Sequence, residues 1–471
     1  MKTDDETLEE ARSPQRRASA DAPLPALAVV WLDGQPSHLG GVILASAEAA
    51  VFGRGEGEGE RRALIIRQTP GANVELGPVK APWLSRRQLR IQALDDRRIM
   101  IESLGKLELK VRGASVAQAV VAPGEHVTLG ERALLLATLR PALLPAPRDW
   151  SEALHDSGAP DPFGLVGESA ALWALRDRVA FIARQRGHVL VLGPSGAGKE
   201  RVAQALHRLS PRRARPLVAR NAATIPTALM DVELFGHVAN FPNPGMRERA
   251  GMVGEADGST LMLDELGELS DELQAHLLRL MDSGEYQRLG DPKPRVADVR
   301  LIGATNRDPE ELKPDLRARF RHVVRVPPLD ERREDIGLLA RHIVRSAARE
   351  DPRLAAQLFV DGEPRFELAL LAALLVHPLS LQVRELEGLL WDALAQATGD
   401  RISCPDTLRR VSVAAAPSDE QPTPELTRDE LQAAIERHDG VLEKVWRELG
   451  LRNRYVLRRL LTKHGIKAAS D

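Results

Sequence analysis

The sequence predicts a multidomain protein: a β-sandwich, then an α/β domain with a helical lid, then a small all-α domain. Short β-like segments separated by Gly and Pro fill residues 24–139. Apolar strand-like runs alternate with amphipathic stretches over residues 163–329, as in a three-layer domain around a mostly parallel sheet. Helix-like segments occupy residues 330–401 and 427–471. A chain of 471 residues accommodates several domains.

The composition excludes several classes of protein. The formal net charge is −2, so contact with a nucleic acid requires a local basic patch. No apolar run approaches the length of a membrane span, and the acidic N-terminus is unlike a signal peptide, so we expect a soluble, cytoplasmic protein. The single cysteine, Cys404, excludes an internal disulfide and a cysteine-based metal cluster.

The first domain follows a polar, aperiodic stretch, residues 1–23, which we expect to be a disordered tail. A linker rich in Pro, Ala and Asp is predicted after this domain, over residues 140–162. The strands of the sandwich are predicted from short apolar segments between turn formers. They are expected at residues 26–31, 63–66, 89–91, 99–101, 107–111 and 133–136.

The elements of the later domains follow from the same patterns. A second linker, rich in Pro, Ser and Ala, is predicted over residues 402–426. Strands of the α/β sheet are expected at residues 188–192, 217–220, 260–263, 299–304 and 323–326. Helices are expected at residues 201–209, 335–345, 366–376, 431–438, 441–449 and 453–463.

The most informative motif is a glycine-rich loop between an apolar run and a helix-like segment. Its glycines allow the backbone to form a nest of N–H donors, and Lys199 can reach the outer phosphates of a nucleotide. A chance glycine-rich loop is the alternative, but the flanking strand and helix favour nucleotide binding. Glu200 replaces the usual Ser or Thr, whose hydroxyl would be a Mg²⁺ ligand. The expected nucleotide-binding residues are Gly193, Pro194, Ser195, Gly196, Ala197, Gly198, Lys199 and Glu200.

Two acids, Asp264 and Glu265, end the apolar run that begins at Thr260. In a parallel sheet this end of the strand faces the phosphate loop, where Asp264 can hold Mg²⁺ and Glu265 can polarise a water. Adjacent acids alone are common on protein surfaces, but after a phosphate loop at this distance they indicate catalysis. The sequence therefore predicts an ATPase with ATP and Mg²⁺ as cofactors.

Residues 163–400 resemble the AAA+ ATPase domain of bacterial enhancer-binding proteins, which act on sigma-54 RNA polymerase. In this family the phosphate loop commonly ends in Glu, so Glu200 fits the family pattern. The resemblance implies a homo-oligomeric ring in which ATP hydrolysis moves loops on one face. It is carried by Leu165-Val-Gly-Glu-Ser169, Gly198-Lys-Glu200, Leu206-His-Arg-Leu-Ser-Pro-Arg212, Glu233-Leu-Phe-Gly-His237, Ala256-Asp-Gly-Ser-Thr-Leu261, Leu277-Leu-Arg-Leu280 and Pro327-Pro-Leu-Asp-Glu-Arg-Arg-Glu-Asp-Ile336.

The resemblance also implies roles for further residues. Asn221 would restrain the catalytic Glu265 until nucleotide and partner engage. Asn306 would be the first sensor, which monitors the γ-phosphate, and Arg384 the second sensor on the lid. Arg319 would be an arginine finger that neutralises transition-state charge in the neighbouring subunit's site.

Three places depart from the family pattern. The family contacts sigma-54 through a Gly-Ala-Phe-Thr-Gly-Ala loop, whereas this chain reads Val238-Ala-Asn-Phe-Pro-Asn-Pro-Gly245, with two prolines that restrict the backbone. The second-sensor segment, Trp-Pro-Gly-Asn-Val-Arg in the family, is His377-Pro-Leu-Ser-Leu-Gln-Val-Arg384 and therefore longer. Lys313 stands where the family often has a second arginine, and lysine lacks the planar fork of arginine. We interpret Arg317 as part of a solvated, charged face of the domain.

Residues 24–139 resemble a forkhead-associated (FHA) domain, a β-sandwich that binds phosphothreonine peptides through its loops. The resemblance is carried by Phe52-Gly-Arg54, by Ser85-Arg-Arg-Gln-Leu-Arg-Ile91 and by Val127-Thr-Leu-Gly130. It implies that Arg54, Ser85 and Arg86 bind the phosphate. Gln88 stands in place of a structural histidine, and Leu107 falls near the place of an asparagine that holds the peptide. A sandwich that only contacts other subunits is the alternative.

Residues 428–466 resemble the Fis-type helix-turn-helix that ends many regulators of this kind. No acidic residue occurs from Leu449 to Ser470, so this segment has a local positive field that suits the phosphates of DNA. A merely solvated basic helix is the alternative, and Leu457, Leu460 and Leu461 are expected in the core of the motif. The expected DNA contacts are Arg452, Asn453, Arg454, Tyr455, Arg458 and Arg459.

These features predict an ATP-dependent regulator of transcription that binds DNA at an upstream site and acts with sigma-54 RNA polymerase. The FHA-like module is expected to bind a phosphothreonine protein. The main alternative is a sigma-54-independent DNA-binding repressor or scaffold that uses ATP only to switch its oligomeric state. A small-molecule kinase is a weaker alternative, because it explains neither the helix-turn-helix nor Asn221, Asn306 and Arg319.

Overall fold

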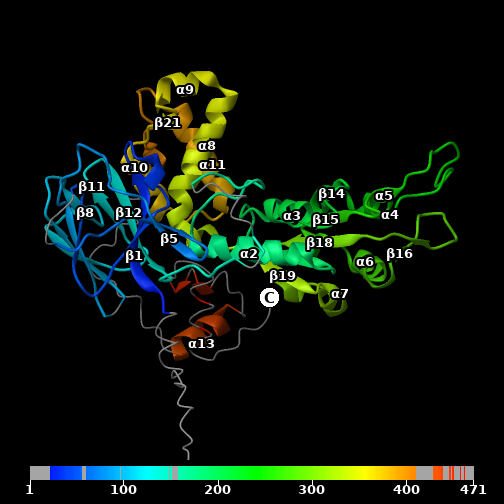
Figure 1. The fold of residues 1–471 in the computed structure, drawn as a ribbon. Helices are drawn as coiled ribbons and strands as arrows, with labels where there is room; N and C mark the ends of the chain where they lie inside the picture. Colours follow the sequence, from blue (N-terminus) through cyan, green and yellow to red (C-terminus); the bar gives the residue numbers. More distant parts are fainter. Residues whose placement is uncertain are drawn as a thin grey trace, which may run out of the picture. The chain divides into compact units, whose positions relative to one another are not determined.

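The computed structural model describes residues 22–55, 60–95, 97–147, 149–150, 158–409, 428–438, 445–446, 448–449, 457 and 461. The chain divides into two compact units, Met1–Ala415 and Ala416–Asp471. In the first unit a sandwich of β-strands, an α/β domain and a helical lid can be followed along the chain (Figure 1). Among the described residues, no helix combines the length and the apolar character needed to cross a membrane.

The N-terminal part is a sandwich of two antiparallel sheets, as expected. The larger sheet has the order β5-β4-β2-β1-β12-β11-β8-β9, and the smaller has the order β10-β7-β6-β3. The strands are β1 (Leu24–Leu32), β2 (Val42–Leu44), β3 (Ala50–Phe52), β4 (Ile66–Thr69), β5 (Ala72–Glu75), β6 (Leu89–Ala93), β7 (Ile99–Ser103), β8 (Leu109–Val111), β9 (Ala114–Ser115), β10 (Gln118–Val121), β11 (His126–Leu129) and β12 (Ala133–Arg140), with the 3₁₀ turn η1 (Pro36–His38).

Most predicted strands of the sandwich are confirmed, with two shifts. The strand predicted at 63–66 starts only at Ile66, and the strand predicted at 107–111 starts at Leu109. Sequence reasoning missed β2, β3, β5, β9, β10 and β11, because strands of two to four residues are too short to show a period of two. The strand β1 is buried along nearly its whole length, which explains its continuous apolar sequence.

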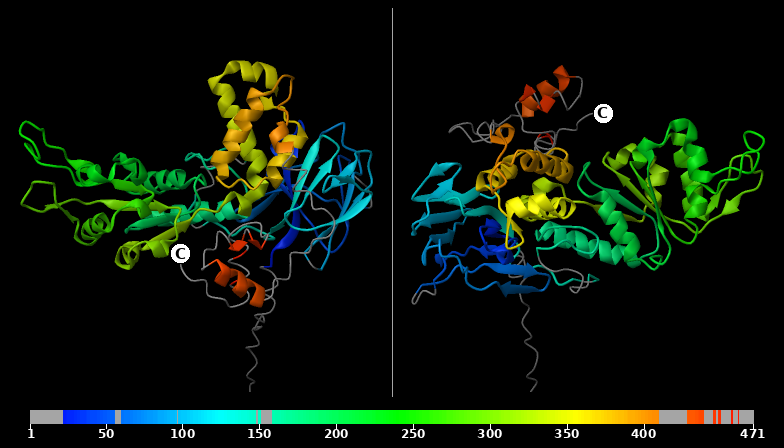
Figure 2. Two further views of the ribbon diagram at one scale, coloured as in Figure 1. Left: turned by 180° about the vertical axis from the view of Figure 1, so that it is seen from behind. Right: turned by 90° about the horizontal axis from the view of Figure 1, so that it is seen from above.

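The α/β domain is built around a five-stranded parallel sheet with the order β14-β15-β18-β13-β19. Alternate residues of strand β13 (Val189–Leu192) pack in different hydrophobic clusters. Val189 and Val191 pack with α2 (Ala170–Arg184) and α3 (Lys199–Arg208), whereas Leu190 packs with the helices of the other face. All five predicted strands are therefore confirmed, between two layers of helices (Figure 2). The strands are β13 (Val189–Leu192), β14 (Leu217–Asn221), β15 (Thr260–Asp264), β18 (Arg300–Thr305) and β19 (His322–Arg325).

The helices of this domain begin and end at residues that suit helix termini. Ser169 caps α2 by accepting a hydrogen bond from Leu172 N, and Ser270 caps α6 in the same way. Gly284 ends α6 with a φ of 75°, a conformation that glycine adopts without strain. The elements are α2 (Ala170–Arg184), α3 (Lys199–Arg208), η3 (Ala222–Thr224), η4 (Thr227–Leu229), α4 (Met230–Phe235), α5 (Gly251–Glu255), η5 (Leu266–Glu268), α6 (Asp271–Ser283), η6 (Pro309–Glu311), α7 (Pro314–Arg319) and the hairpin β16 (Glu285–Tyr286) and β17 (Arg295–Val296).

The lid follows the sheet and is mainly helical. The helices predicted at 335–345 and 366–376 are confirmed as α8 and α10. Ile402 and Cys404, which the sequence places in a linker, are buried in the same core as these helices. The elements are η7 (Leu329–Asp335), α8 (Ile336–Glu350), α9 (Pro352–Leu358), β20 (Phe359–Val360), β21 (Glu363–Pro364), α10 (Leu368–Val376) and α11 (Gln382–Ala395).

The sandwich and the lid share one hydrophobic core. Trp31 of β1 meets the ring of Phe366 edge to face, with ring centroids 5.1 Å apart. At Gly337 of α8, an added Cβ would lie 2.0 Å from the carbonyl oxygen of Val30, so only glycine allows this approach of helix and strand. The sequence suggested a module joined by a linker, but these contacts are tertiary and leave no periodic signal in either segment.

The second unit is described only in part. Its helix α13 (Arg428–Arg437) corresponds to the packing helix predicted at 431–438. Leu457 and Leu461 are buried with Leu431, Ala434 and Val445, as expected for the apolar side of a small helical domain.

Candidate nucleotide-binding site

The predicted phosphate loop connects β13 to α3 and adopts a conformation that needs glycine. Gly196 and Gly198 have φ values of 77° and 105°, in the left-handed region that other residues rarely adopt. A Cβ at Gly196 would also lie 2.2 Å from the carbonyl oxygen of Leu381. The loop therefore presents its backbone at the N-terminus of α3, an arrangement that suits binding of phosphate groups.

Lys199 is the first residue of α3, and its side chain is buried across this loop. Its Nζ donates a hydrogen bond to the carbonyl oxygen of Gly193 at 3.1 Å and lies 3.9 Å from Oε1 of Glu265. Glu200, by contrast, is exposed and accepts a hydrogen bond from Gln204 on the same helix. Glu200 thus belongs to the outer surface of α3 in this structure.

The two predicted acids lie at the carboxyl end of β15. Asp264 is the last residue of the strand, and its Oδ1 accepts a hydrogen bond from the backbone N–H of Glu265 at 3.0 Å. Glu265 has a φ of 52°, an uncommon conformation for a side chain other than Gly, Asn or Asp. Strain of this kind is found at functional sites, and the carboxylate of this glutamate lies 3.9 Å from Nζ of Lys199.

The two asparagines expected to act in catalysis also lie at this edge of the sheet. Asn221 is paired in register with Asp264, but its amide oxygen accepts a hydrogen bond from Ala223 N and so caps η3. The expected restraint on Glu265 is therefore not formed by that oxygen. Asn306 directly follows Thr305, whose carbonyl oxygen accepts a hydrogen bond from Gly193 N at 3.3 Å.

The lid closes on the phosphate loop through the start of α11. Arg384 donates a hydrogen bond to the hydroxyl of Ser195 at 3.3 Å, and Val383 N donates one to the carbonyl oxygen of Gly196 at 3.2 Å. The longer second-sensor segment is accommodated by left-handed backbone at Leu379 and Gln382, whose φ values are 44° and 57°. The predicted second sensor thus reaches the loop despite the departure from the family pattern.

Arg319 ends α7 and forms a two-pronged ion pair with Asp282 of α6, with Nη2 at 3.1 Å from Oδ2. Both side chains are about half exposed, at 46% and 42%. No hydrogen bond or ion pair joins Arg319 to residues 193–200, all of which the structure describes. Lys313, at the other end of α7, donates to the carbonyl oxygen of Asp271. Arg319 and Lys313 thus both pair with residues of α6 at the surface of the domain.

The segment expected to contact sigma-54 packs against the loop between β16 and β17. A Cβ at Gly290 would lie 2.7 Å from the ring of Phe241, so the ring rests directly on that glycine. The backbone N–H of Val238 also donates to the carbonyl oxygen of Leu289 at 3.1 Å. The phenylalanine is therefore held by the neighbouring loop in this structure.

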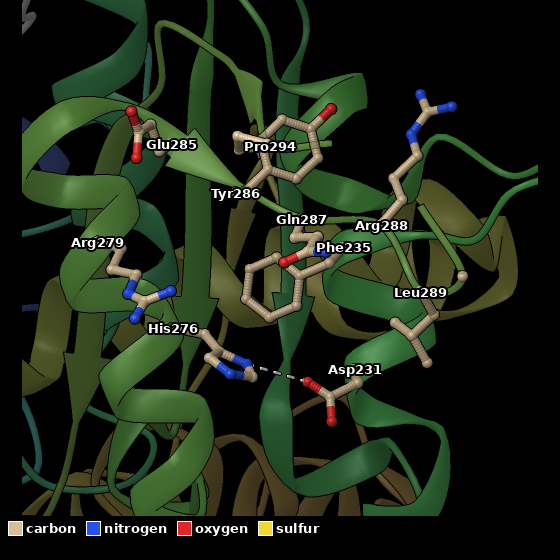
Figure 3. A pocket seen from close by; sticks show the side chains of 11 residues that line it. Asp231, Phe235, His276, Arg279, Glu285, Tyr286, Gln287, Arg288, Leu289 and Pro294 are labelled. Carbon is tan, nitrogen blue, oxygen red and sulfur yellow. Dashed lines mark ion pairs between the residues drawn. The ribbon is translucent and has the colours of Figure 1, made fainter. Parts of the chain in front are cut away.

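A cavity of about 300 Å³ opens beside this segment, between α4, α6 and the β16–β17 hairpin (Figure 3). Asp231 and His276 pair across one side of it at 3.4 Å, and Phe235 packs edge-on against the histidine ring. None of the residues that line it belongs to the predicted nucleotide site. The cavity is thus separate from the chemistry of the phosphate loop.

The three residues expected to bind phosphothreonine are brought together at one end of the sandwich. Arg54 N donates to the carbonyl oxygen of Ser85 at 3.0 Å, and the hydroxyl of Ser85 accepts from Lys106 N at 3.0 Å. Arg54 and Arg86 are exposed. Gln88, in place of a histidine, is fully buried and donates to the carbonyl oxygen of Leu107.

Two sets of residues complete the account of the predicted sites. The expected DNA contacts, Arg452, Asn453, Arg454, Tyr455, Arg458 and Arg459, lie outside the described residues. Sequence reasoning missed Arg332, which is buried in η7 and donates to the carbonyl oxygen of Ala197 in the phosphate loop at 3.2 Å. Its segment was noted only as part of a family motif, and no local pattern indicates where a buried arginine points.

Comparisons with known proteins show which family contains the α/β domain. Residues 165–326 match the family described as the Sigma-54 interaction domain. The chain is 38% identical over 312 residues to the transcriptional regulatory protein ZraR of Klebsiella oxytoca, covering 63% of this chain and 68% of ZraR. It is 34% identical over 313 residues to the Nif-specific regulatory protein of Azotobacter vinelandii, covering 63% of this chain and 58% of that protein.

Similar solved structures include NtrX from Brucella abortus in complex with ADP, at 28% identity and a TM-score of 0.47. That alignment covers 64% of this chain and 70% of NtrX. The complex of the same protein with ATP gives 29% identity, a TM-score of 0.46 and coverage of 64% and 69%.

The family match covers the strands and helices that hold the phosphate loop, and the predicted ATPase class is thereby confirmed. The roles of individual residues stay predictions. The chain belongs to the family of sigma-54-interacting AAA+ transcriptional regulators, the bacterial enhancer-binding proteins.

Proposed function

We propose that this protein is a DNA-bound ring ATPase that regulates transcription with sigma-54 RNA polymerase in response to a phosphothreonine protein. The observation that supports it best is the convergence of Lys199, Glu265 and Arg384 on one phosphate loop. These residues come from a helix, a strand end and the lid, so their convergence is a property of the fold. Membership of the sigma-54-interacting family supports the proposed polymerase partner.

In the proposed site, ATP binds along residues 193–200, with the phosphates on the backbone N–H groups and on Lys199. Asp264 would hold Mg²⁺, which proteins usually bind through one or two carboxylates together with the phosphates of the nucleotide. Such an ion would neutralise charge on the phosphates when bound. Asp264 fits this arrangement, because its carboxylate lies at the carboxyl end of β15, beside Glu265.

The remaining residues would have separate roles in ATP hydrolysis. Glu265 would orient and polarise the attacking water, and Asn306 would respond to the γ-phosphate. Arg384 would report nucleotide binding to the lid, since it already contacts Ser195. Arg319 would act in the neighbouring subunit, because its own phosphate loop is not among its partners.

The sigma-54 partner is tested by promoter opening with purified components. We expect this protein, ATP and sigma-54 RNA polymerase to convert closed promoter complexes into open ones, detected by permanganate reactivity of unpaired thymines. ATP omission and polymerase with a different sigma factor are the controls. ATP turnover without open complexes would contradict the proposal and favour a sigma-54-independent repressor or scaffold, which the contact of Phe241 with Gly290 also favours.

The sandwich is proposed to bind phosphothreonine through Arg54, Ser85 and Arg86. Arg54→Ala should weaken binding of a phosphothreonine peptide selected from a library by about tenfold or more, because charge-assisted hydrogen bonds to phosphate are strong. Arg87→Ala is the matched control, since Arg87 is paired with Glu60 at 2.7 Å. Fluorescence polarisation measures both, and equal binding by the two variants would contradict the assignment.

A further inference from the structure

The contact between the sandwich, the lid and the phosphate loop contains a network of buried charged side chains. Ionised groups cost free energy when buried, and such networks seldom add stability over apolar packing. Their presence beside the nucleotide site therefore needs another explanation. The network consists of Arg140 from β12 and of Arg332, Glu334 and Asp335 from η7, with exposed fractions of 1%, 4%, 8% and 1%.

Arg140 is the last residue of the sandwich's final strand and reaches into the ATPase. Its Nη1 and Nη2 both donate to the carbonyl oxygen of Glu168 at 3.0 Å, and its Nε lies 3.3 Å from Oε2 of Glu334. Burial raises the pKa of Glu334 to about 7, and the Arg140 charge opposes that shift. The charged form of the Glu334 carboxylate in the lid is thus stabilised by Arg140 of the sandwich.

Asp335 holds the same peptide from the lid side. Its Oδ1 accepts hydrogen bonds from Glu168 N at 2.7 Å and Ser169 N at 2.9 Å, and its Oδ2 accepts one from the Ser169 hydroxyl at 2.6 Å. Gly167 allows this approach, because a Cβ there would lie 2.4 Å from the carboxylate. The start of α2 is therefore clamped between Arg140 of the sandwich and Asp335 of the lid.

Arg332 extends the network to the nucleotide site. Its Nη2 donates to the carbonyl oxygen of Ala197, which lies between the two left-handed glycines of the phosphate loop. Arg332 is otherwise surrounded by protein; burial lowers the pKa of its guanidinium, and the carboxylate of Asp335 opposes that shift. The η7 segment thus contacts both the start of α2, through Asp335, and the phosphate loop, through Arg332.

We propose that Arg140 and Arg332 are positioning residues for ATP binding. Through them, the contact between the sandwich and the lid fixes the conformation of the phosphate loop. The sandwich is then a structural part of the nucleotide site as well as a recognition module. This inference depends on ATP binding by the chain, and it is independent of sigma-54 and of any phosphopeptide.

The experiment measures the Kd of a fluorescent ATP analogue with Mg²⁺ for the full-length chain and four variants. Arg140→Met and Arg332→Met should each raise the Kd by about tenfold, a size typical of changes along coupled contacts. The rise in Kd of the double variant should be smaller than the product of the two single rises, because both changes remove contacts of the same segment, η7. Arg90→Met is the control, because Arg90 pairs with Glu102 on the exposed side of the sandwich. The Kd of this variant for the ATP analogue should stay within about twofold of the wild-type value.

Thermal unfolding of each variant separates positioning from simple stabilisation. A lower Tm for Arg140→Met with an unchanged Kd would overturn the proposal, and so would strictly multiplicative effects in the double variant. If Arg140→Met does not unfold cooperatively, Arg140→Lys replaces it, since it keeps the charge and loses the paired donors. Absence of ATP binding by the wild type would instead contradict the assignment of the nucleotide site, so the two failures are distinguishable.

Discussion

Glu265→Gln should leave ATP binding nearly unchanged and reduce ATP turnover by about 100- to 10,000-fold, the range typical of losing a general base. The amide keeps the shape of the carboxylate but cannot accept a proton or polarise the attacking water as strongly. The loss of its 3.9 Å ion pair with Lys199 should have little effect on affinity, because neither group forms a direct hydrogen bond with the other. Phosphate release and equilibrium binding of an ATP analogue measure the two quantities separately.

The matched control for this variant is Glu268→Gln, three residues along the chain. Glu268 is exposed and paired with Arg307, so its neutralisation should leave turnover within about twofold of the wild type. Undiminished phosphate release by Glu265→Gln would contradict the catalytic assignment. A large loss of ATP affinity would also contradict it, since it would indicate a binding role for the carboxylate.

Local motifs made much of the nucleotide site predictable from the sequence. The phosphate loop and the acids after β15 follow short apolar strands, and strand ends in a parallel sheet meet at one edge. Arg384 contacts Ser195 of the loop, and two residues with left-handed backbone accommodate its longer segment. That local adjustment could not be predicted, because it depends on how the lid meets the loop.

The contacts between modules were not predictable for a different physical reason. The clamp on Glu168 joins Arg140 and Asp335, which are far apart in the sequence and carry no periodic signal. Buried charged residues in particular resemble surface residues in composition. Only the tertiary structure shows that Gly337 allows a strand of the sandwich to contact the lid, so the sequence alone suggested a more separable domain.

Arg319→Ala should reduce ATP turnover by about 1,000-fold or more, as is typical for the loss of an arginine finger, without weakening ATP binding. The guanidinium is half exposed, and Asp282 is its ion-pair partner among the residues that the structure describes, so its removal should cost little stability. Arg317→Ala on the same helix is the control, because its exposed side chain is expected to be only solvated. Steady-state phosphate release measures both variants.

Mixing the two inactive variants tests whether Arg319 acts across a subunit boundary. In a ring, each Arg319→Ala subunit retains Glu265, and a neighbouring Glu265→Gln subunit retains Arg319. Random assembly of an equal mixture places both intact residues at about a quarter of the head-to-tail interfaces, so turnover should recover to about a quarter of the wild-type value. An arginine that acted within its own subunit would give no recovery, because every subunit in the mixture would then lack one of the two residues. Recovery would therefore identify the site as shared between neighbouring subunits and make assembly itself a requirement for hydrolysis.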